Sequence, residues 1–456
     1  MLNLGLHLND AELTLVSQGN IVYREPGYAM IDNEEFSFGN KAYKHARTNP
    51  RQIHNRFWSD LLLTPSSNKK FHNLSRADIA SYHLEEILQS NITSDESMVV
   101  VVPPYFDSSA LSLFLGIAAD LKLPISVLID SAVAATRREY KNAVPIHVDI
   151  SLHYTTLSRL TQQQGIYIDK VEIIENCGIS EMCDAWLNVI AKSFVEQSRF
   201  DPMHKAETEQ VLLNQLEGCL DSVLKQENIK LSLEYLGVKH SAEIDSKTFK
   251  SAASSFFHLI SDKLRYLYNA DEIPAIQVTD RVAKLPGLLE TLQDSSRGEI
   301  FTLEPGATVQ GGLSRLNNNA DTKSEISLLK QLPWDKPSIS VESNEVKNFV
   351  VNSPTHIIFR NKAYKLHELP LVIGYQVDDE PYFLAIDYGL SGVSRRHCIV
   401  TRIEGRTVIE DVSQYGTFLN GNRINGSSLL KVGDSVRIGT PGVHLELITL
   451  DMDNGT

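Results

Sequence analysis

The chain has 456 residues, of which 42% are hydrophobic and 22% charged, and its formal net charge at pH 7 is −14. This composition is ordinary for globular proteins, and the length predicts two or three domains. Because nucleic acids and anionic lipid surfaces are also negatively charged, the acidic balance disfavours nonspecific binding to either. We therefore expect protein partners, no nucleic acid and no membrane insertion.

The four cysteines are scattered along the chain and have neither Cys-x-x-Cys nor Cys/His spacing. They predict reduced thiols rather than a disulfide framework or a zinc site. Residues 1–9 lack the basic segment and apolar run of a signal peptide. The longest apolar run, residues 98–102, is far shorter than the roughly 20 residues that a membrane helix needs. These features favour a soluble, cytoplasmic protein.

Within residues 1–316, short apolar runs alternate with helical patterns. Ser75 and Asp78 have capping-box-like spacing, which predicts the start of a helix. Residues 98–102 are typical of a strand buried on both faces. Asp201 and Pro202 predict the start of a long amphipathic helix. Strands that alternate with helices indicate an α/β architecture.

A series of short motifs in residues 1–316 resembles the actin/heat-shock chaperone ATPase superfamily. The matching stretches, in the superfamily's order, are residues 39–50, 100–107, 128–135, 148–151, 286–288 and 306–312. The resemblance implies a two-lobed α/β domain of the actin-like, or ribonuclease H-like, kind. It also implies three glycine-containing loops that hold ATP, together with carboxylates that hold hydrated Mg²⁺.

The residues at those loops depart from the superfamily's pattern. In the first phosphate loop, His7 stands at the Asp position and Asn9 at the Gly position. In the second loop Asp149 is kept, but Ser151 occupies a glycine position, and Asp280 lies where the adenosine loop should begin with Gly-Gly. Side chains here would crowd the phosphates, because close backbone approach requires glycine. We therefore expect a pseudo-ATPase with no catalytic residue, no cofactor and no metal.

An alternative use of this region is a metal site. His7, His153 and Asp149 are chemically suitable ligands for a transition metal. Structural or solvent-exposed histidines are the simpler interpretation of the same residues.

Residues 317–337 are predicted to form a polar interdomain linker, because residues 317–324 are polar and aperiodic and Pro333 and Pro337 follow. From residue 338 to residue 456 the pattern is all-β. Residues 398–403 and 406–410 flank Glu404-Gly405, which predicts a hairpin.

Residues 350–450 resemble the forkhead-associated (FHA) domain. The shared elements, in the family's order, are Gly374, residues 394–397, residues 411–421, Gly433-Asp434 and Ile438-Gly439. The resemblance implies a β-sandwich whose loops at one end bind phosphothreonine peptides. A phosphate carries about −1.5 to −2 charge and needs a hydroxyl, backbone N–H groups and cations around it. The expected phosphopeptide-binding residues are Ser394, Arg395, Arg396, Gly416 and Thr417.

Three nearby positions qualify this expectation. His397 is expected to brace the loop through a buried hydrogen bond rather than to touch the ligand. Tyr375 follows Gly374, where the family usually has an Arg that is a principal phosphate ligand, and Tyr415 replaces an Asn that holds the peptide backbone. The loss of the Arg removes a fixed charge and a planar donor fork. Arg396 and Arg402 are the candidates to replace it.

The favoured interpretation is an adaptor or scaffold that joins a pseudo-ATPase actin-like domain to an FHA recognition module for phosphothreonine partners. One alternative is a structural component of a cytoskeletal or secretion/pilus-type assembly. Another is an active chaperone-like ATPase with atypical loops, which the missing glycines and the lack of a substrate-binding domain after residue 316 disfavour.

Overall fold

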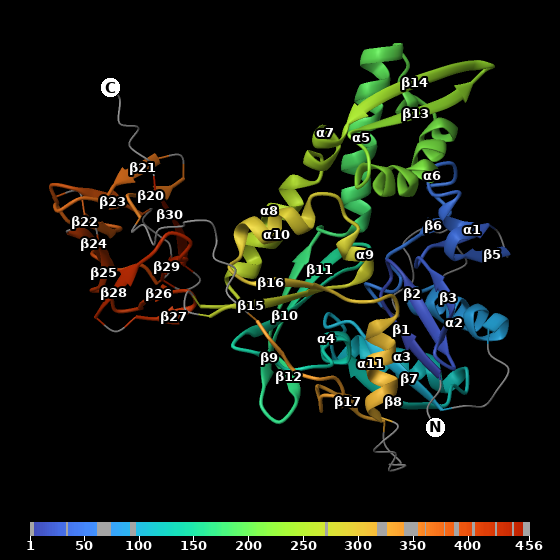
Figure 1. The fold of residues 1–456 in the computed structure, drawn as a ribbon, viewed down its shortest axis with the longest axis horizontal. Coiled ribbons are helices and arrows are strands. Elements are labelled where there is room, and N and C mark those ends of the chain that lie inside the picture. Colours follow the sequence, from blue (N-terminus) through green and yellow to red (C-terminus); the bar gives the residue numbers. More distant parts are fainter. Residues whose placement is uncertain are drawn as a thin grey trace. The chain divides into compact units, whose positions relative to one another are not determined.

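The computed structural model describes residues 4–32, 35–61, 74–91, 97–269, 272–316, 326–341, 354–360, 362–377, 379–386, 392–403, 406–424, 426–439 and 442–449. The chain forms two compact units (Figure 1). The first consists of Met1–Lys263 and Ile273–Glu342, and the second of Leu264–Glu272 and Ser343–Thr456.

The first unit contains two six-stranded sheets. In sheet order, the strands of the first are β17 (Leu328–Leu329), β8 (Ile125–Asp130), β7 (Met98–Val102), β1 (Leu4–His7), β2 (Leu13–Ser17) and β3 (Asn20–Glu25). Those of the second are β16 (Glu299–Thr302), β15 (Pro274–Val278), β10 (Val144–Ile150), β11 (Tyr154–Gln162), β12 (Ile166–Glu175) and β18 (Gln331–Leu332).

The two sheets share one pattern of pairing. In the first, β1, β2 and β3 form an antiparallel meander, and β7 and then β8 join parallel to β1. In the second, β10, β11 and β12 form the meander, and β15 and β16 join parallel to β10. The first unit therefore contains the same five-stranded arrangement twice.

Smaller elements complete the first unit. The remaining strands are β4 (Ala29–Asp32), β5 (Glu35–Phe38), β6 (Ile53–His54), β9 (Tyr140–Lys141), β13 (Asn228–Tyr235), β14 (Val238–Asp245) and β19 (Ile339–Ser340). The helices are α1 (Gly39–Tyr43), α2 (Arg76–Asn91), α3 (Ser108–Asp120), α4 (Ser131–Ala135), α5 (Ile179–Ser198), the 3₁₀ turn η1 (Pro202–His204), α6 (Ala206–Val223), α7 (Ser246–Ser251), α8 (Ser254–Arg265), α9 (Asp280–Ala283), α10 (Leu288–Ser295) and α11 (Ala307–Leu316).

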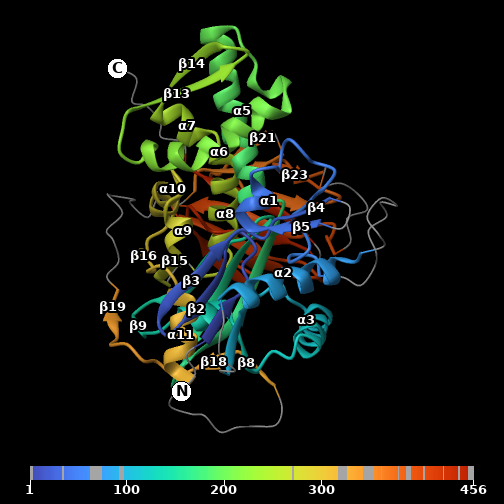
Figure 2. The same ribbon diagram turned by 90° about the vertical axis from the view of Figure 1, so that its right-hand side faces the viewer.

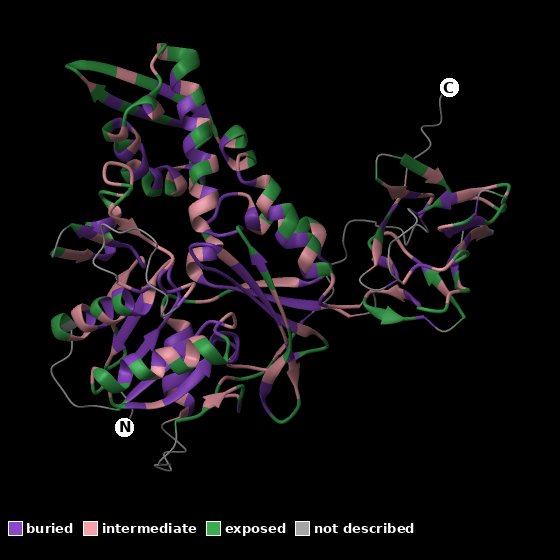
Figure 3. Ribbon diagram, turned by 180° about the vertical axis from the view of Figure 1, so that it is seen from behind, coloured by how far each residue is buried: buried purple, intermediate pink, exposed green. Residues whose placement is uncertain are grey.

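Strand β7 is buried on both faces, as its run of apolar residues predicted. Alternate side chains of a strand point to opposite faces. Met98, Val100 and Val102 pack in a core with α2 and α3, while Val99 and Val101 pack with α11. The helices accordingly lie on opposite sides of the first sheet (Figure 2), and the central strands of both sheets are largely buried (Figure 3).

Of the two helix starts predicted from the sequence, the one at Ser75 is correct and the one at Asp201 is not. At α2 the backbone N–H of Ser75 donates to Asp78 Oδ2 at 2.7 Å and that of Asp78 donates to Ser75 Oγ at 3.1 Å, so the capping box is confirmed. Asp201 instead caps η1, through a hydrogen bond from the Met203 N–H at 3.0 Å. The long amphipathic helix α6 begins only at Ala206.

Part of the predicted interdomain linker, residues 317–337, belongs to the sheets of the first unit. Residues 317–325 lie outside the described residues, but β17 pairs with β8, β18 pairs with β12, and β19 pairs with β9. The second unit begins at Ser343 rather than at residue 338. An edge strand of two residues needs only backbone hydrogen bonds, so it leaves no apolar period in the sequence.

The second unit is a sandwich of two sheets. In sheet order, the strands of the first are β21 (Lys362–Lys365), β20 (His356–Phe359), β30 (Val443–Ile448), β29 (Val436–Ile438), β26 (Thr417–Leu419) and β27 (Asn422–Arg423). Those of the second are β23 (Phe383–Ala385), β22 (Leu371–Gly374), β24 (Cys398–Ile403), β25 (Arg406–Asp411) and β28 (Ser427–Leu430). The predicted pairing of β24 with β25 is confirmed, and apolar side chains from both sheets form one core.

Candidate functional site

Ser394 links two loops at one end of the sandwich. It lies between β23 and β24, and its Oγ accepts a hydrogen bond from the backbone N–H of Gln414, in the loop between β25 and β26, at 3.1 Å. Its own backbone N–H donates to His397 Nδ1 at 3.0 Å. With Oγ already accepting one bond, the hydroxyl proton can be donated to a ligand.

His397 is the brace behind these loops. The side chain is fully buried, and Nε2 donates to the carbonyl oxygen of Gly416 at 3.1 Å. Because Nδ1 accepts from Ser394, Nε2 must carry the ring proton, and the imidazole is neutral. Burial lowers the pKa of His397, although the bond to Gly416 and the charge of Asp411 act in the opposite direction. The predicted bracing role is confirmed.

Tyr375 lies against the loop that carries Ser394 and Arg395. A side chain at Gly374 would place its Cβ 1.9 Å from the Arg395 carbonyl oxygen, so this close approach requires glycine. The backbone N–H of Tyr375 donates to the Ser394 carbonyl at 3.3 Å, and Arg395 Nε donates to the Tyr375 hydroxyl at 3.2 Å. Tyr375 thus supplies no charge itself but orients the exposed guanidinium of Arg395.

Two of the expected phosphopeptide-binding residues have other partners. Arg396 Nε pairs with Glu380 Oε1 at 3.0 Å. Thr417 is fully buried, and its hydroxyl donates to Asp411 Oδ1 at 2.9 Å, so its side chain stabilises the loop and does not face a ligand. Gly416 has a φ of 94°, a left-handed conformation that favours glycine. The structure therefore brings together Ser394, Arg395 and Gly416.

The sequence also suggested Arg402 as a replacement cation and missed Arg423. Arg402 lies four residues along β24 from Cys398, beside the hairpin and away from the Ser394 loop. Arg423 is exposed and lies against Gly416, where an added Cβ would be 2.6 Å from its Nε. The sequence feature that could have identified Arg423 is the two-residue turn Asn420-Gly421, because this turn folds Arg423 back beside β26.

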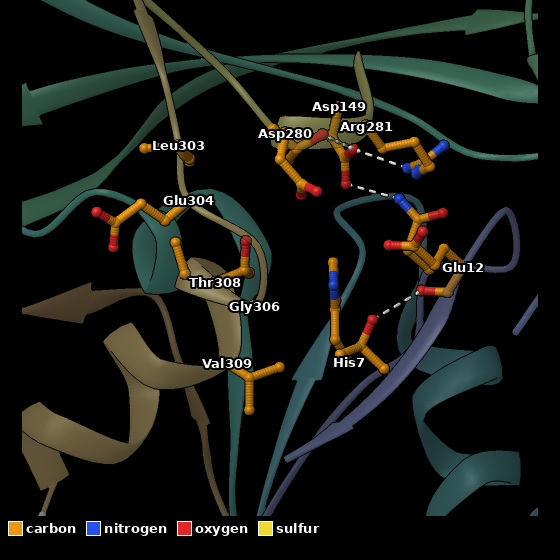
Figure 4. Close-up of a pocket in the computed structure, with 14 residues that line it drawn as sticks. His7, Glu12, Asp149, Asp280, Arg281, Leu303, Glu304, Gly306, Thr308 and Val309 are labelled. Carbon is orange, nitrogen blue, oxygen red and sulfur yellow. Dashed lines mark hydrogen bonds and ion pairs between the residues drawn. The ribbon is translucent and has the colours of Figure 1, made fainter. Parts of the chain in front are cut away.

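In the first unit, a polar cleft lies where β1, β10 and β15 end (Figure 4). Asn9 Nδ2 donates to Asp149 Oδ2 at 2.7 Å. The other oxygen of Asp149 accepts from Thr279 Oγ1 at 3.3 Å and from Arg281 Nη2 at 3.2 Å. Both carboxylate oxygens of Asp149 thus accept hydrogen bonds from protein side chains.

Asp280 and Ser151 also have hydrogen-bond partners within the protein. Asp280 accepts from Arg24 Nη2 at 2.7 Å, and Arg24 also pairs with Glu12 at 2.7 Å. Ser151 Oγ donates to the Tyr154 carbonyl at 3.1 Å, closing the turn between β10 and β11. These contacts hold the loops in place through side chains.

The cleft is small and its histidine is neutral. Its cavity volume is about 30 Å³, which is room for one or two water molecules. His7 lines it and is buried, and this burial lowers the pKa of His7 to about 4. A larger cavity of about 440 Å³ shares Glu12 and Arg281 with this cleft, and its remaining lining combines charged residues and tyrosines with many apolar side chains.

The alternative metal site is not assembled. His153 Nδ1 lies 3.1 Å from Glu181 Oε1, and Nε2 lies 3.3 Å from the carbonyl oxygen of Asn55. Over the ranges that the structure describes, there is no group of three or more His, Cys, Asp or Glu side chains arranged to hold a metal ion.

Within the same ranges, no helix combines the length and apolar character needed to span a bilayer.

The second unit's sandwich, with a serine and an exposed arginine on its braced loops, defines a protein-interaction module. Residues 381–439 match the model of the FHA domain family, and this part of the chain is an FHA domain, a module type that binds phosphothreonine. None of the curated proteins compared with the chain matches it.

Proposed function

We propose that the protein is an adaptor that joins a phosphothreonine-reading FHA domain to an actin-like pseudo-ATPase domain. The observation that carries the first half is the loop geometry around Ser394. Its hydroxyl is fixed by the Gln414 N–H, and the exposed Arg395 guanidinium is oriented beside it by Tyr375. A hydroxyl and a cation from one loop are what a phosphate requires.

The second half is supported by strand order and by the cleft. The first unit contains a three-stranded meander joined to two parallel strands twice, which supports the two-lobed α/β domain that the resemblance to actin and the chaperones implies. The hydrogen bonds from Asn9, Thr279 and Arg281 to Asp149 fill the region where that superfamily binds phosphate.

The FHA function is tested with the full-length protein and a degenerate peptide library that carries a fixed phosphothreonine. Wild-type protein should enrich phosphopeptides over their unphosphorylated twins. A hydrogen bond to a charged group contributes about 1.5–3 kcal/mol, so Ser394→Ala should weaken the best phosphopeptide roughly 10- to 100-fold. Ser427→Ala, at an exposed serine on β28, is the matched control and should bind like wild type. Equal capture of both peptide forms by wild type would refute the proposal.

A second candidate function is a structural component of a cytoskeletal or secretion/pilus-type assembly. The tip of the β13–β14 hairpin favours it, because Leu236 is 85% exposed and Val238 is 55% exposed. Such side chains are available to a second copy of the chain. Light scattering over a range of concentrations separates the two functions, since an adaptor should keep a constant mass whereas an assembly component should grow.

A further inference from the structure

The turn between β26 and β27 fixes the position of Arg423. Asn420 and Gly421 have φ values of 51° and 83°, the left-handed pair of a tight two-residue hairpin. Asn420 is itself held, because its Nδ2 donates to Asp434 Oδ1 at 3.0 Å and its Oδ1 accepts from the Ser435 N–H at 2.9 Å. The hairpin pairs Arg423 with Phe418, so both side chains lie on the same face of the sheet.

From this position the Arg423 side chain covers Gly416. A Cβ added to Gly416 would lie 2.6 Å from Nε, 3.0 Å from Cδ and 3.1 Å from Cζ of Arg423. Gly416 is buried, whereas Arg423 is exposed. Among the residues that the structure describes, the Arg423 guanidinium has no hydrogen-bond acceptor and no ion-pair partner. An exposed, unneutralised cation therefore lies directly on the loop residue that precedes β26.

Gly416 is also the residue that connects this cation to Ser394. Its carbonyl accepts from His397 Nε2 at 3.1 Å, and His397 Nδ1 accepts from the Ser394 N–H at 3.0 Å. The imidazole ring of His397 therefore bridges the Ser394 loop and the Gly416 loop. The same two loops are also joined by the hydrogen bond from the Gln414 N–H to Ser394 Oγ. Arg395 thus lies on the Ser394 loop, and Arg423, on β27, lies against Gly416 in the loop that is bonded to Ser394.

The other cations of this region are engaged or distant. Arg396 is paired with Glu380, and Arg402 lies at the other end of β24. The Arg437 guanidinium lies 3.9 Å from the centre of the Phe418 ring and also donates to the Gly439 carbonyl. Tyr375 is uncharged and occupies the place of the family's usual arginine.

We propose that Arg423 supplies the second positive charge of the phosphothreonine site, in place of the arginine that is missing after Gly374. This inference rests on the proposed FHA function. Arg395 follows Ser394 on its loop, and Arg423 lies against Gly416, in the loop whose Gln414 N–H bonds the Ser394 hydroxyl. A phosphate dianion with three acceptor oxygens can accept hydrogen bonds from all three groups.

The experiment measures binding of one enriched phosphothreonine peptide and its unphosphorylated twin to the full-length protein by fluorescence anisotropy. Arg423→Gln should weaken the phosphopeptide about tenfold or more and leave the twin unchanged, because charge-assisted hydrogen bonds are lost. Arg423→Lys should recover part of the loss, since it restores charge without the planar fork. Melting temperatures of all variants confirm that they fold.

Lys365→Gln is the matched control for the change in net charge. Lys365 is exposed and pairs with His356, which pairs with Ile448 at the far end of β30 from the Gly416 loop. It should bind like wild type. If Arg423→Gln binds like wild type while Ser394→Ala loses binding, the inference about Arg423 fails and the FHA function stands. If wild type itself does not distinguish the two peptides, the proposed function fails and the inference fails with it.

Discussion

His83 lies in the core of the first unit with both ring nitrogens hydrogen-bonded. Trp58 Nε1 donates to Nδ1 at 3.1 Å, so Nε2 carries the proton and bonds the Tyr23 hydroxyl at 3.0 Å. The ring stacks on Phe38 at 4.7 Å between centroids. Burial lowers the pKa of His83 to about 3. The residue is therefore neutral in the folded protein over the whole physiological range of pH.

This burial predicts a pH-dependent stability. Unfolded histidine titrates near 6.5, so below that pH the unfolded state binds a proton that folded His83 does not. The free energy of unfolding should therefore fall between pH 6.5 and about 3, by up to about 1.4 kcal/mol per pH unit for this residue. Urea unfolding between pH 7 and pH 5 should show a smaller slope for His83→Gln than for wild type. His258→Gln, at an exposed position on α8, should keep the wild-type slope; an unchanged slope in His83→Gln contradicts the prediction.

At the recognition loops, the sequence predicted some residue roles and missed others. The bracing role of His397 could be predicted because His397 and Ser394 lie within one short loop motif and are joined by a local hydrogen bond. The buried role of Thr417 and the position of Arg423 depend on contacts between strands, with Asp411 and Gly416 respectively. Such contacts follow from register and from the direction of each side chain, which a motif does not specify.

Among the elements, the strands β17, β18 and β19 are the part that the sequence least predicted. β7 and α2 carry an apolar run and a capping box, whereas these three edge strands have two residues each. The side chain of Asp335, between β18 and β19, joins this segment to the rest of the first unit. Asp335 accepts hydrogen bonds from Arg137 Nε at 3.0 Å and from Ser314 Oγ at 2.6 Å. Burial alone would raise the pKa of Asp335, but these bonds hold it below its ordinary value.

We expect Asp335→Asn to destabilise the first unit, because the partly exposed ion pair with Arg137 loses one of its charges. The hydrogen bonds are charge-assisted but partly accessible to solvent, so the expected loss in free energy of unfolding is about 1–2 kcal/mol. Chemical denaturation followed by tryptophan fluorescence measures it. Asp294→Asn makes the same substitution at an exposed position on α10 and should change stability by less than about 0.5 kcal/mol. Equal effects of the two substitutions would mean that Asp335 does not attach this segment.

On the scale of the whole molecule, the repeated strand order of the first unit is not visible as a sequence repeat. β1 and β10 begin equivalent meanders, yet they share no obvious motif, because the order is set by backbone pairing that many sequences can satisfy. His7, Asn9, Asp149 and Asp280 line one cleft, although they are widely separated in the sequence. Their assignment to altered nucleotide loops stays a prediction.

The same cleft yields the prediction that decides between the pseudo-ATPase and the active enzyme. Asn9, Thr279 and Arg281 already satisfy Asp149, and the cavity beside it has a volume of only about 30 Å³. Binding of ATP phosphates at Asp149 would require these bonds to break and the loops to separate. We expect isothermal titration with ATP·Mg²⁺ to show negligible binding, and the melting temperature to stay constant up to millimolar nucleotide. Asn9→Gly removes one bond to Asp149 and restores the superfamily's residue at that position, so any latent affinity should emerge first in this variant. Micromolar binding of ATP to wild type with measurable release of phosphate would instead identify an active ATPase with atypical loops.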